Sequence, residues 1–397
     1  MAAARPDLLL RSIVFPLDYS FRRDPEGRLY SDRGVLPWER YLLFASEIVV
    51  VSRPSVPAGS PTAGMSLATH ERVRFVEVPS LSGPLIRFTN RPRVRAVLEE
   101  ELRNADALLV RLPGEIGALA FRIAERLQKR IAVELVACTW DALWNYGTWQ
   151  GRLHAPYSWL ETRRLVRRAP HVLYVSDRFL QRRYPTSGYA VGCSDVDVPD
   201  LDDEILDRRL KRIRAAGEPF VIGMIGALYV RYKGFRTALD ALAESRSELP
   251  PFEFRILGAG DPAEVGAYAA EMGLSDRVVF SGTRTPGAAV RAWLDEVDLY
   301  IQPSFQEGLP RAMVEALSRA CPCVGSSAGG IPELLDPECV HEPGDARHLA
   351  QLILTAANGR GWQEHQAARN FEVAKRFQAS ALDRRREQFF AAALGAA

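Results

Sequence analysis

The stretch SFQEGLPRAMVEALSRACPCV, residues 304–324, places a loop, a helix and a new strand in immediate succession. The spacing of its apolar residues predicts a helix over 309–319, and the apolar run that follows predicts a strand over 321–327. Two acids lie eight positions apart, Glu307 before the helix and Glu315 inside it. The positive N-terminal end of the helix dipole accounts for Glu307. It does not account for Glu315, which lies within the apolar pattern.

The alternation of strand and helix in this stretch continues along the whole chain, which is typical of parallel sheets built from βαβ units. In the first half, strands are predicted at 12–17, 47–53, 73–79, 105–113, 130–137 and 171–176, and helices at 37–45, 91–103, 115–128 and 156–168. In the second half, strands are predicted at 220–226, 252–260, 277–282, 299–304 and 321–327, and helices at 234–246, 262–272, 286–295, 309–319 and 362–394. The expected fold class is therefore α/β with doubly wound sheets.

The chain has 397 residues, more than one typical core contains, and this favours two domains. We expect an N-terminal domain at 1–195 and an acidic linker with a short helix at 196–218. A second domain is expected at 219–361. The helical segment at 362–397 is a candidate to pack back on the N-terminal domain. A cleft between two such domains would collect ligands at the carboxyl ends of the strands.

The composition excludes several classes of protein. Hydrophobic residues make up 47% and charged residues 25%, as in soluble globular proteins, and no run approaches the roughly 18 apolar residues of a membrane span. The cysteines are odd in number and scattered, which predicts buried free thiols in a reducing compartment, here the cytoplasm, with no disulfide framework and no zinc site. They are Cys138, Cys193, Cys321, Cys323 and Cys339.

The two halves of the chain differ in charge. Residues 1–215 carry 33 Lys and Arg against 26 Asp and Glu, whereas residues 216–397 carry 18 against 23. Arginine-rich stretches at 161–170 and 178–185 explain much of the basic excess. They face either solvent or an anionic acceptor, such as a pyrophosphoryl lipid, which implies a peripheral contact with the inner membrane surface. A nucleic-acid partner is not expected, because the excess is modest and no aromatic-basic motif accompanies it.

Loops of the second half bring glycines and basic residues to predicted strand ends. The loop after Gly226 carries Arg231 and Lys233 to a helix start, where basic side chains and free N–H groups favour an anion. Gly308 and Leu309 offer further N–H groups at the next helix start, an arrangement that suits a diphosphate. The alternative for the first loop is a solvated basic loop without a ligand.

The combined pattern resembles the donor-site signature of retaining glycosyltransferases of family 4, which have the GT-B fold of two facing Rossmann-like domains. The resemblance is carried by SFQEGLPRAMVEALSRACPCVGSSAGGIPEL from position 304 and by the upstream blocks IGALYVRYKG, RILGAGDP and VVFSGT. It covers essentially all of 219–340. The first half resembles, more loosely, bacterial members that build capsular and other exopolysaccharides, and in the family this domain holds the acceptor.

The resemblance implies a role for each matched residue. Glu307 is expected to contact donor-sugar hydroxyls, and Glu315 to bind the ribose, whose two hydroxyls a carboxylate can accept from. Lys233 matches the lysine that holds the diphosphate. The family's arginine is absent at Ala227, and Arg231 is the candidate to replace it. The remaining matches are backbone positions near the phosphates and the nucleobase: Gly226, Gly308, Leu309, Thr283 and Arg284.

The implied chemistry is transfer of a sugar from a nucleotide-diphosphate sugar with retained anomeric configuration, without a metal and without a cofactor. In the family the departing phosphate takes the acceptor proton, so Glu307 is not assigned as a nucleophile. The polar group that relatives have at the end of the strand at 130–137 is missing here, where Cys138 follows. Asp141 is the best local substitute, to orient or deprotonate the acceptor. The alternative for Asp141 is a helix N-cap.

Other interpretations remain open at this point. Asp195 and Asp197 form a D-x-D, the metal-binding pair of glycosyltransferases with a different fold, but they lie in the acidic linker. A GT-B epimerase or phosphorylase is disfavoured, since a phosphorylase needs a further lysine for pyridoxal phosphate and the chain has only four. A sugar-nucleotide-binding scaffold without catalysis is the non-enzymatic alternative. The acceptor is a sugar, a lipid-linked sugar or a small natural product.

Overall fold

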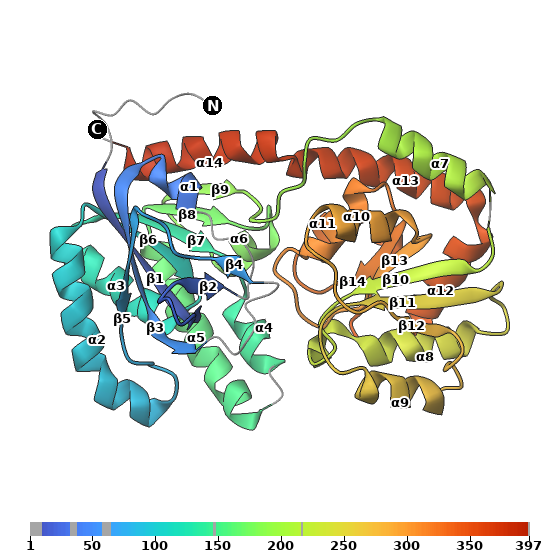
Figure 1. The fold of residues 1–397 in the computed structure, drawn as a ribbon, viewed down its shortest axis with the longest axis horizontal. Coiled ribbons are helices and arrows are strands. Elements are labelled where there is room, and N and C mark those ends of the chain that lie inside the picture. Colours follow the sequence, from blue (N-terminus) through green and yellow to red (C-terminus); the bar gives the residue numbers. More distant parts are fainter. Residues whose placement is uncertain (1–9, 32–37, 58–64, 146–147, 216, 396–397) are drawn as a thin grey trace. The chain divides into compact units, whose positions relative to one another are not determined.

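The computed structural model describes residues 10–31, 38–57, 65–145, 148–215 and 217–395. Its chain divides into two compact units. Unit 1 comprises 1–139, 156–193 and 385–397, and unit 2 comprises 140–155 and 194–384. Each contains a parallel-rich sheet with helices packed against it, which confirms the expected α/β class (Figure 1).

The sheet of unit 1 is parallel at its centre, in the order β5-β3-β1-β6-β7-β8-β9. Its strands are β1 (Leu10–Arg23), β3 (Ala45–Pro57), β5 (Val73–Glu77), β6 (Ala107–Leu112), β7 (Arg130–Leu135), β8 (His171–Tyr174) and β9 (Tyr189–Gly192). The helices are α1 (Trp38–Leu42), α2 (Pro84–Asn104), α3 (Glu115–Arg126), α6 (Phe179–Arg183) and most of α5 (Trp149–Arg168). Helix α3 packs against β1, β6 and β7, and α2 packs on α3.

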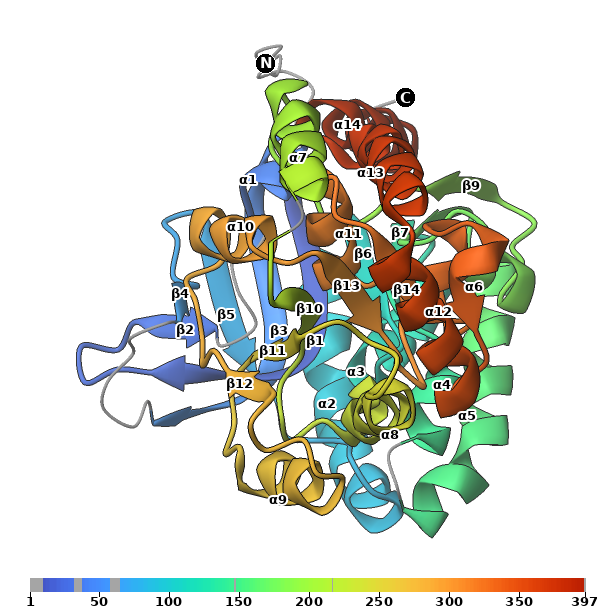
Figure 2. The ribbon, with the colours of Figure 1, turned by 90° about the vertical axis from the view of Figure 1, so that its right-hand side faces the viewer.

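The sheet of unit 2 is wholly parallel, in the order β12-β11-β10-β13-β14-β15. Its strands are β10 (Phe220–Ile225), β11 (Phe252–Leu257), β12 (Val278–Phe280), β13 (Leu299–Gln302), β14 (Cys323–Ser326) and β15 (Val340–His341). Its helices include α8 (Phe235–Ser245), α9 (Ala263–Glu271), α10 (Ala288–Asp295), α11 (Arg311–Ser318), α12 (Ala346–Asn358) and α13 (Arg360–Ala374). Helices α8, α9 and α12 cover one face of the sheet, and α10, α11 and α13 cover the other (Figures 1 and 2). The sheet is therefore doubly wound.

Several features differ from the sequence-based expectation, among them strands β9 and β15 and helix α12, which were not predicted. Strand β1 extends beyond the predicted run and pairs antiparallel with β2 (Leu29–Ser31), which pairs in turn with β4 (Ser66–Leu67). The stretch 196–218, expected as an acidic linker with a short helix, contains that helix as α7 (Glu204–Ala215) and belongs to unit 2. That helix is charged in sequence, yet its Arg209 is only 3% exposed. The Arg209 guanidinium donates to three backbone carbonyls, so α7 is bound to its unit by a satisfied buried cation.

The end of the chain is shared between the units. Helix α14 (Ala379–Leu394) enters unit 1 from Arg385 onward. Its Phe389 and Phe390 are fully buried, and the Phe390 ring lies 5.5 Å from the ring of Tyr41, centroid to centroid. Aromatic pairs at this separation stabilise a core beyond the area they bury. The last turns of the chain are thus part of the core of unit 1.

None of the helices within the described ranges combines the length and the apolar character that crossing a membrane requires.

Replacing Phe390 with alanine should lower the free energy of unfolding of unit 1 by about 3–5 kcal/mol, since the cavity left by a buried aromatic ring is only partly filled. Chemical denaturation followed by circular dichroism measures the change. Gln388→Ala, at an exposed position of the same helix, is the control and should shift stability little. Equal stability of the two variants would show that α14 is not part of the core.

Candidate active site

The candidate site lies above the carboxyl ends of β10 and β13, neighbouring parallel strands at the point where the winding of the sheet reverses. In doubly wound sheets, ligands bind outside the carboxyl ends of the strands at such a point. The loop after β10 ends at Lys233, and the loop after β13 carries Glu307. Lys233 Nζ donates to Glu307 Oε1 at 2.8 Å, and the two side chains are 20% and 10% exposed. The structure therefore brings these two predicted residues together.

A buried polar network fixes the Glu307 carboxylate. Ser304 Oγ donates to Glu307 Oε1 at 2.7 Å, and Gln302 Nε2 donates to the same oxygen at 2.9 Å. Gln302 is itself oriented by Tyr300, whose hydroxyl donates to Gln302 Oε1 at 2.6 Å. Tyr300, Gln302 and Ser304 are fully buried. Oε1 thus accepts three hydrogen bonds, while Oε2 has no partner among the described residues and is left for a ligand.

Two glycines hold the loops of the site at backbone contact. Gly234 has φ +85°, and a Cβ there would lie 2.0 Å from the carbonyl oxygen of Pro303. Gly329 has φ +60°, and a Cβ there would lie 2.0 Å from the carbonyl oxygen of Glu307. Any side chain at either position would push the Glu307 loop out of place. Gly329 therefore allows its loop to pack against the backbone of Glu307.

Two backbone amides are available beside Glu307. Helix α11 begins at Arg311, and the N–H groups of Gly308 and Leu309 precede it without an acceptor among the described residues. Gly308 is half-buried, and its carbonyl accepts from the Gly330 amide at 2.7 Å, which fixes the direction of the peptide. Free amides in series at a helix N-terminus form an anion site. The predicted helix start at 309 was two residues too early, because Pro310 is the N-cap and the helix begins at Arg311.

Glu315 lies in the second turn of α11, half-buried, and its carboxylate has no hydrogen bond or ion pair with any described residue. Burial raises the pKa of Glu315 above its ordinary value, and the positive charges of Arg311 and Arg291 only partly offset this. An unpaired carboxylate in such a place destabilises the folded chain. Its presence is accounted for if a ligand with hydroxyl donors binds it.

The other predicted residues of the site lie apart from this cluster. The Arg231 side chain is 86% exposed, and its Nη2 lies 3.5 Å from Glu264 Oε1. Thr283 and Arg284 are exposed in the loop after β12. Gly226, the residue after β10, is the exception, because a Cβ there would lie 3.2 Å from Lys233 Cγ. None of the first three contacts Lys233 or Glu307 through an ion pair or hydrogen bond, and their roles stay predictions.

Asp141 is the third residue of α4 (Thr139–Trp144) and not its N-cap, which removes the alternative offered for it. From Trp140 to Ala155 the chain belongs to the same unit as Glu307. Asn145, directly after α4, donates to the backbone oxygen of Phe305 at 3.3 Å. The helix that carries Asp141 therefore ends against the loop of Glu307.

The cysteines are all free and buried, as the sequence predicted: Cys138, Cys193, Cys321, Cys323 and Cys339. Cys138, at the position where relatives have a polar group, accepts from Arg183 Nη1 at 3.0 Å. The D-x-D acids Asp195 and Asp197 are exposed in the segment between β9 and α7. Their part of the chain is separate in sequence from the loops that hold Glu307.

Three polar residues of this region were missed in the sequence. Gln302 and Ser304 lie in the apolar run LYIQPS. The amide of Gln302 inside a buried strand was the sequence signal that could have indicated a polar network here. Gln306, next to Glu307, has a buried side-chain oxygen without a partner in the described structure. A buried acceptor of this kind needs a donor from water or ligand.

Replacing Glu315 with glutamine should stabilise the free protein at pH 7. If Glu315 accepts hydrogen bonds from a ribose, as the sequence resemblance implies, the change should also weaken nucleotide binding about tenfold or more, because these bonds are charge-assisted. The gain in stability should vanish as the pH falls through the raised pKa of Glu315, where the wild-type carboxyl is itself protonated. Thermal unfolding at several pH values and titration calorimetry measure both effects. Lower stability at pH 7 together with unchanged binding would assign Glu315 a structural role.

Comparison with known proteins relates this geometry to a family. Residues 219–358 match the model of the family described as "Glycosyl transferases group 1". The chain is 28% identical over 336 residues to the protein CapJ of Staphylococcus aureus, covering 84% of this chain and 83% of CapJ. It is 29% identical over 264 residues to the 2-deoxystreptamine glucosyltransferase of Streptomyces kanamyceticus, covering 63% of this chain and 67% of that enzyme.

Solved structures show the same fold. The structure of Anabaena HepE in complex with UDP-glucose superposes with a TM-score of 0.65 at 17% sequence identity, covering 96% of this chain and 99% of HepE. The two Rossmann-like sheets and this likeness identify the GT-B fold that the sequence predicted. The chain thus has the GT-B fold, and its residues 219–358 are similar to the group 1 glycosyl transferases.

Proposed function

We propose that the protein is a retaining glycosyltransferase that moves a sugar from a nucleotide-diphosphate sugar to a hydroxyl group of an acceptor. The observation that carries this proposal is the Lys233–Glu307 pair at the switch point of unit 2, with Glu307 Oε2 unpartnered. Beside the pair lie the free amides of Gly308 and Leu309. A cation, two N–H donors and a carboxylate acceptor suit a molecule that joins phosphates to a polyol.

The donor would bind along this arrangement from base to sugar. Lys233 and the two amides hold the diphosphate, and Glu315 accepts hydrogen bonds from the ribose hydroxyls. Glu307 accepts from hydroxyls of the sugar through its unpartnered oxygen. The base is held beside Thr283 and Arg284, and Arg231 adds positive charge near the phosphates.

In the proposed reaction, the bond between the anomeric carbon and the diphosphate oxygen breaks, and the diphosphate leaves with the electron pair. The acceptor oxygen forms its bond to the anomeric carbon on the same face, and its proton passes to the departing phosphate. Charge develops on the leaving group, so the Lys233 ammonium and the amides stabilise the transition state more than the bound donor. Glu307 positions the sugar and is no nucleophile in this route. Asp141 orients the acceptor hydroxyl or accepts its proton.

The proposal needs no metal, because Lys233 and the amide dipoles neutralise the leaving group. The product would be a polysaccharide or glycoconjugate, made in the cytoplasm. The choice of a polysaccharide or glycoconjugate as the product rests on the sequence resemblance of the first half of the chain. A small natural product is the second candidate acceptor, and the identity with the 2-deoxystreptamine glucosyltransferase favours it. Incubation with a lipid-linked sugar in one reaction and an aminocyclitol in another separates the two.

A thermal-shift screen with UDP-, GDP-, ADP- and TDP-sugars tests the donor, with UDP-glucose as the first probe. A donor at 100 times its dissociation constant should stabilise the protein by about 2.7 kcal/mol. Lys233→Met should abolish this shift, whereas Lys211→Met, at an exposed position of α7, should retain it. Donor turnover should persist in EDTA.

Three outcomes would contradict the proposal. The absence of a shift with every donor would exclude a sugar-nucleotide site. A shift without hydrolysis or transfer would indicate a binding scaffold that has lost catalysis. Loss of turnover in EDTA, restored by Mg²⁺, would exclude the metal-independent route.

A further inference from the structure

Two stacked indole rings lie beside the loop of Glu307. They belong to Trp140 and Trp144 of α4, and their centroids are 5.3 Å apart with 13° between the ring planes. A spacing of four residues brings both side chains to one side of the helix. Trp144 remains 43% exposed, although Trp140 stacks on it. An exposed ring that a neighbour holds in one orientation is a surface on which a ligand ring can stack.

Arg152 covers the outer side of this pair. Its guanidinium carbon lies 5.8 Å from the centroid of the Trp144 ring, close to the outer limit of a cation–π contact. Rings stacked as closely as these leave no room for a guanidinium between them, so Arg152 lies on the side of Trp144 that Trp140 leaves open. Arg152 is exposed, and its side chain has no ion pair or hydrogen bond with the described residues. A weak, exposed contact of this kind can be exchanged for a contact with a ligand.

Hydrogen bonds join the indole pair to the candidate site. Asn145, the residue after Trp144, donates from its side chain to the backbone oxygen of Phe305 at 3.3 Å. The Phe305 amide donates in turn to the backbone oxygen of Tyr232 at 2.7 Å, and Tyr232 precedes Lys233. All of these residues belong to unit 2. The end of α4 is therefore attached to both loops of the site.

The indole pair lies on the side of the site that is opposite to the proposed place of the base. Thr283 and Arg284, which would lie beside the base, follow β12, whereas Phe305 follows β13. Three strand spacings separate β12 from β13, or about 14 Å. Through the contact with Phe305, chain geometry limits the Cα separation of Trp144 and Glu307 to about 20 Å. A short molecule can span this distance without passing the base.

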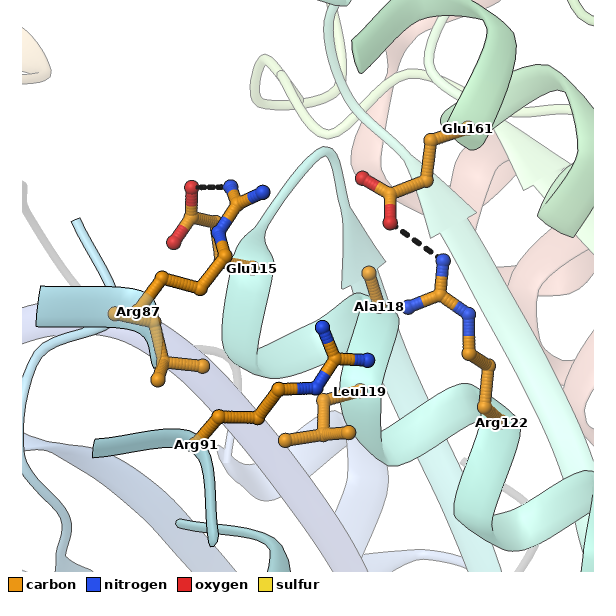
Figure 3. Close-up of a pocket in the computed structure, with 8 residues that line it drawn as sticks. Arg87, Arg91, Glu115, Ala118, Leu119, Arg122 and Glu161 are labelled. Atoms are coloured by element: carbon orange, nitrogen blue, oxygen red, sulfur yellow. Dashed lines mark hydrogen bonds and ion pairs between the residues drawn. The ribbon is translucent and has the colours of Figure 1, made fainter. Parts of the chain in front are cut away.

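The pocket between α2, α3 and α5 in unit 1 has a different character (Figure 3). Arg87 pairs there with Glu115, and Arg122 pairs with Glu161. Both acids are thus bound to arginines, and no aromatic side chain of the described chain lines this pocket. The indole pair is therefore the better surface for a ligand ring.

A sugar ring fits the indole pair by its chemistry. A pyranose carries C–H groups on its faces and hydroxyl groups around its edge. The face of an indole is apolar and bears the negative part of the ring quadrupole, so it attracts such C–H groups. The guanidinium of Arg152 and the side-chain amide of Asn145 supply N–H donors for the hydroxyl groups.

We propose that Trp144 is the stacking surface for one sugar ring of a saccharide acceptor, and that Arg152 moves from the indole to the hydroxyls of that ring. The inference rests on the proposed function and deepens it, because it assigns the acceptor to saccharides of two or more rings. The ring that receives the new bond lies near Glu307, and a further ring lies on Trp144. Asp141, which would orient the acceptor hydroxyl, is on the same helix.

Transfer kinetics test the inference, with a sugar nucleotide that passes the donor screen. The acceptors are oligosaccharides from a partial acid hydrolysate of bacterial exopolysaccharides, separated into fractions of one, two and three rings. The wild type should show a lower apparent KM for the longer fractions than for single rings. Trp144→Ala should raise the apparent KM for the longer fractions about tenfold or more, and much more than it lowers kcat. The thermal shift produced by the donor should be the same in both proteins.

Two variants serve as controls. Trp149→Ala removes an indole that is 68% exposed but outside the stacked pair, and it should keep the apparent KM of the wild type. Trp144→Phe retains an aromatic face and should recover most of the binding that Trp144→Ala loses. Thermal unfolding without ligand shows that each variant is folded.

The inference is overturned if the donor is hydrolysed but no saccharide fraction receives a sugar, or if Trp144→Ala and Trp149→Ala have the same apparent KM. Transfer to an aminocyclitol alone would also overturn it. Failure of the proposed function gives a different result. In that case no sugar nucleotide shifts the thermal unfolding of the wild type, and the inference is overturned together with the function on which it rests.

Discussion

The candidate site depends on how one carboxylate oxygen is held. Glu307 Oε1 accepts hydrogen bonds from Lys233, Ser304 and Gln302, and Tyr300 orients the last of these. Breaking such a buried network leaves unsatisfied groups, so its geometry is strongly determined. The same network places a cation beside the carboxylate and leaves Oε2 unpartnered. In the proposed function, this single arrangement would let a phosphate and a hydroxyl bind in one small volume.

Much of the fold could be predicted from the sequence, because hydrophobic periodicity and strand ends are local signals. All strands of unit 2 except the two-residue β15, and the loops with Lys233 and Glu307, were found in this way. The antiparallel strands β2 and β4 were not, since they have only three and two residues. Strand β2 pairs with the nearby end of β1, whereas its pairing with β4 is distant in sequence. Arg209 was predicted only as part of a charged helix in the linker. Its burial was not predicted, because the backbone carbonyls that it donates to are brought together only in the folded chain.

The site was predicted less completely than the fold. Residue types indicated Glu307 and Glu315, but not that Gln302 and Ser304 would fix the first while the second would be left unpaired. Arg231 appears basic and well placed in the sequence, yet its side chain is exposed and near Glu264. Side-chain direction depends on tertiary neighbours, which one sequence does not specify. The unpaired Glu315 also lowers the stability of the folded chain, because burial disfavours its charged form and so raises its pKa. Residues that lower stability in this way are expected at functional sites.

The central claim is that Glu307 Oε2 is reserved for the donor sugar, and calorimetric titration of Glu307→Gln tests it most directly. Each protein is titrated with a sugar nucleotide and with the corresponding nucleoside diphosphate, and the ratio of the two dissociation constants reports the contribution of the sugar. In Glu307→Gln this contribution should fall about tenfold or more, while binding of the diphosphate alone changes little. An unchanged ratio in the variant would contradict the account.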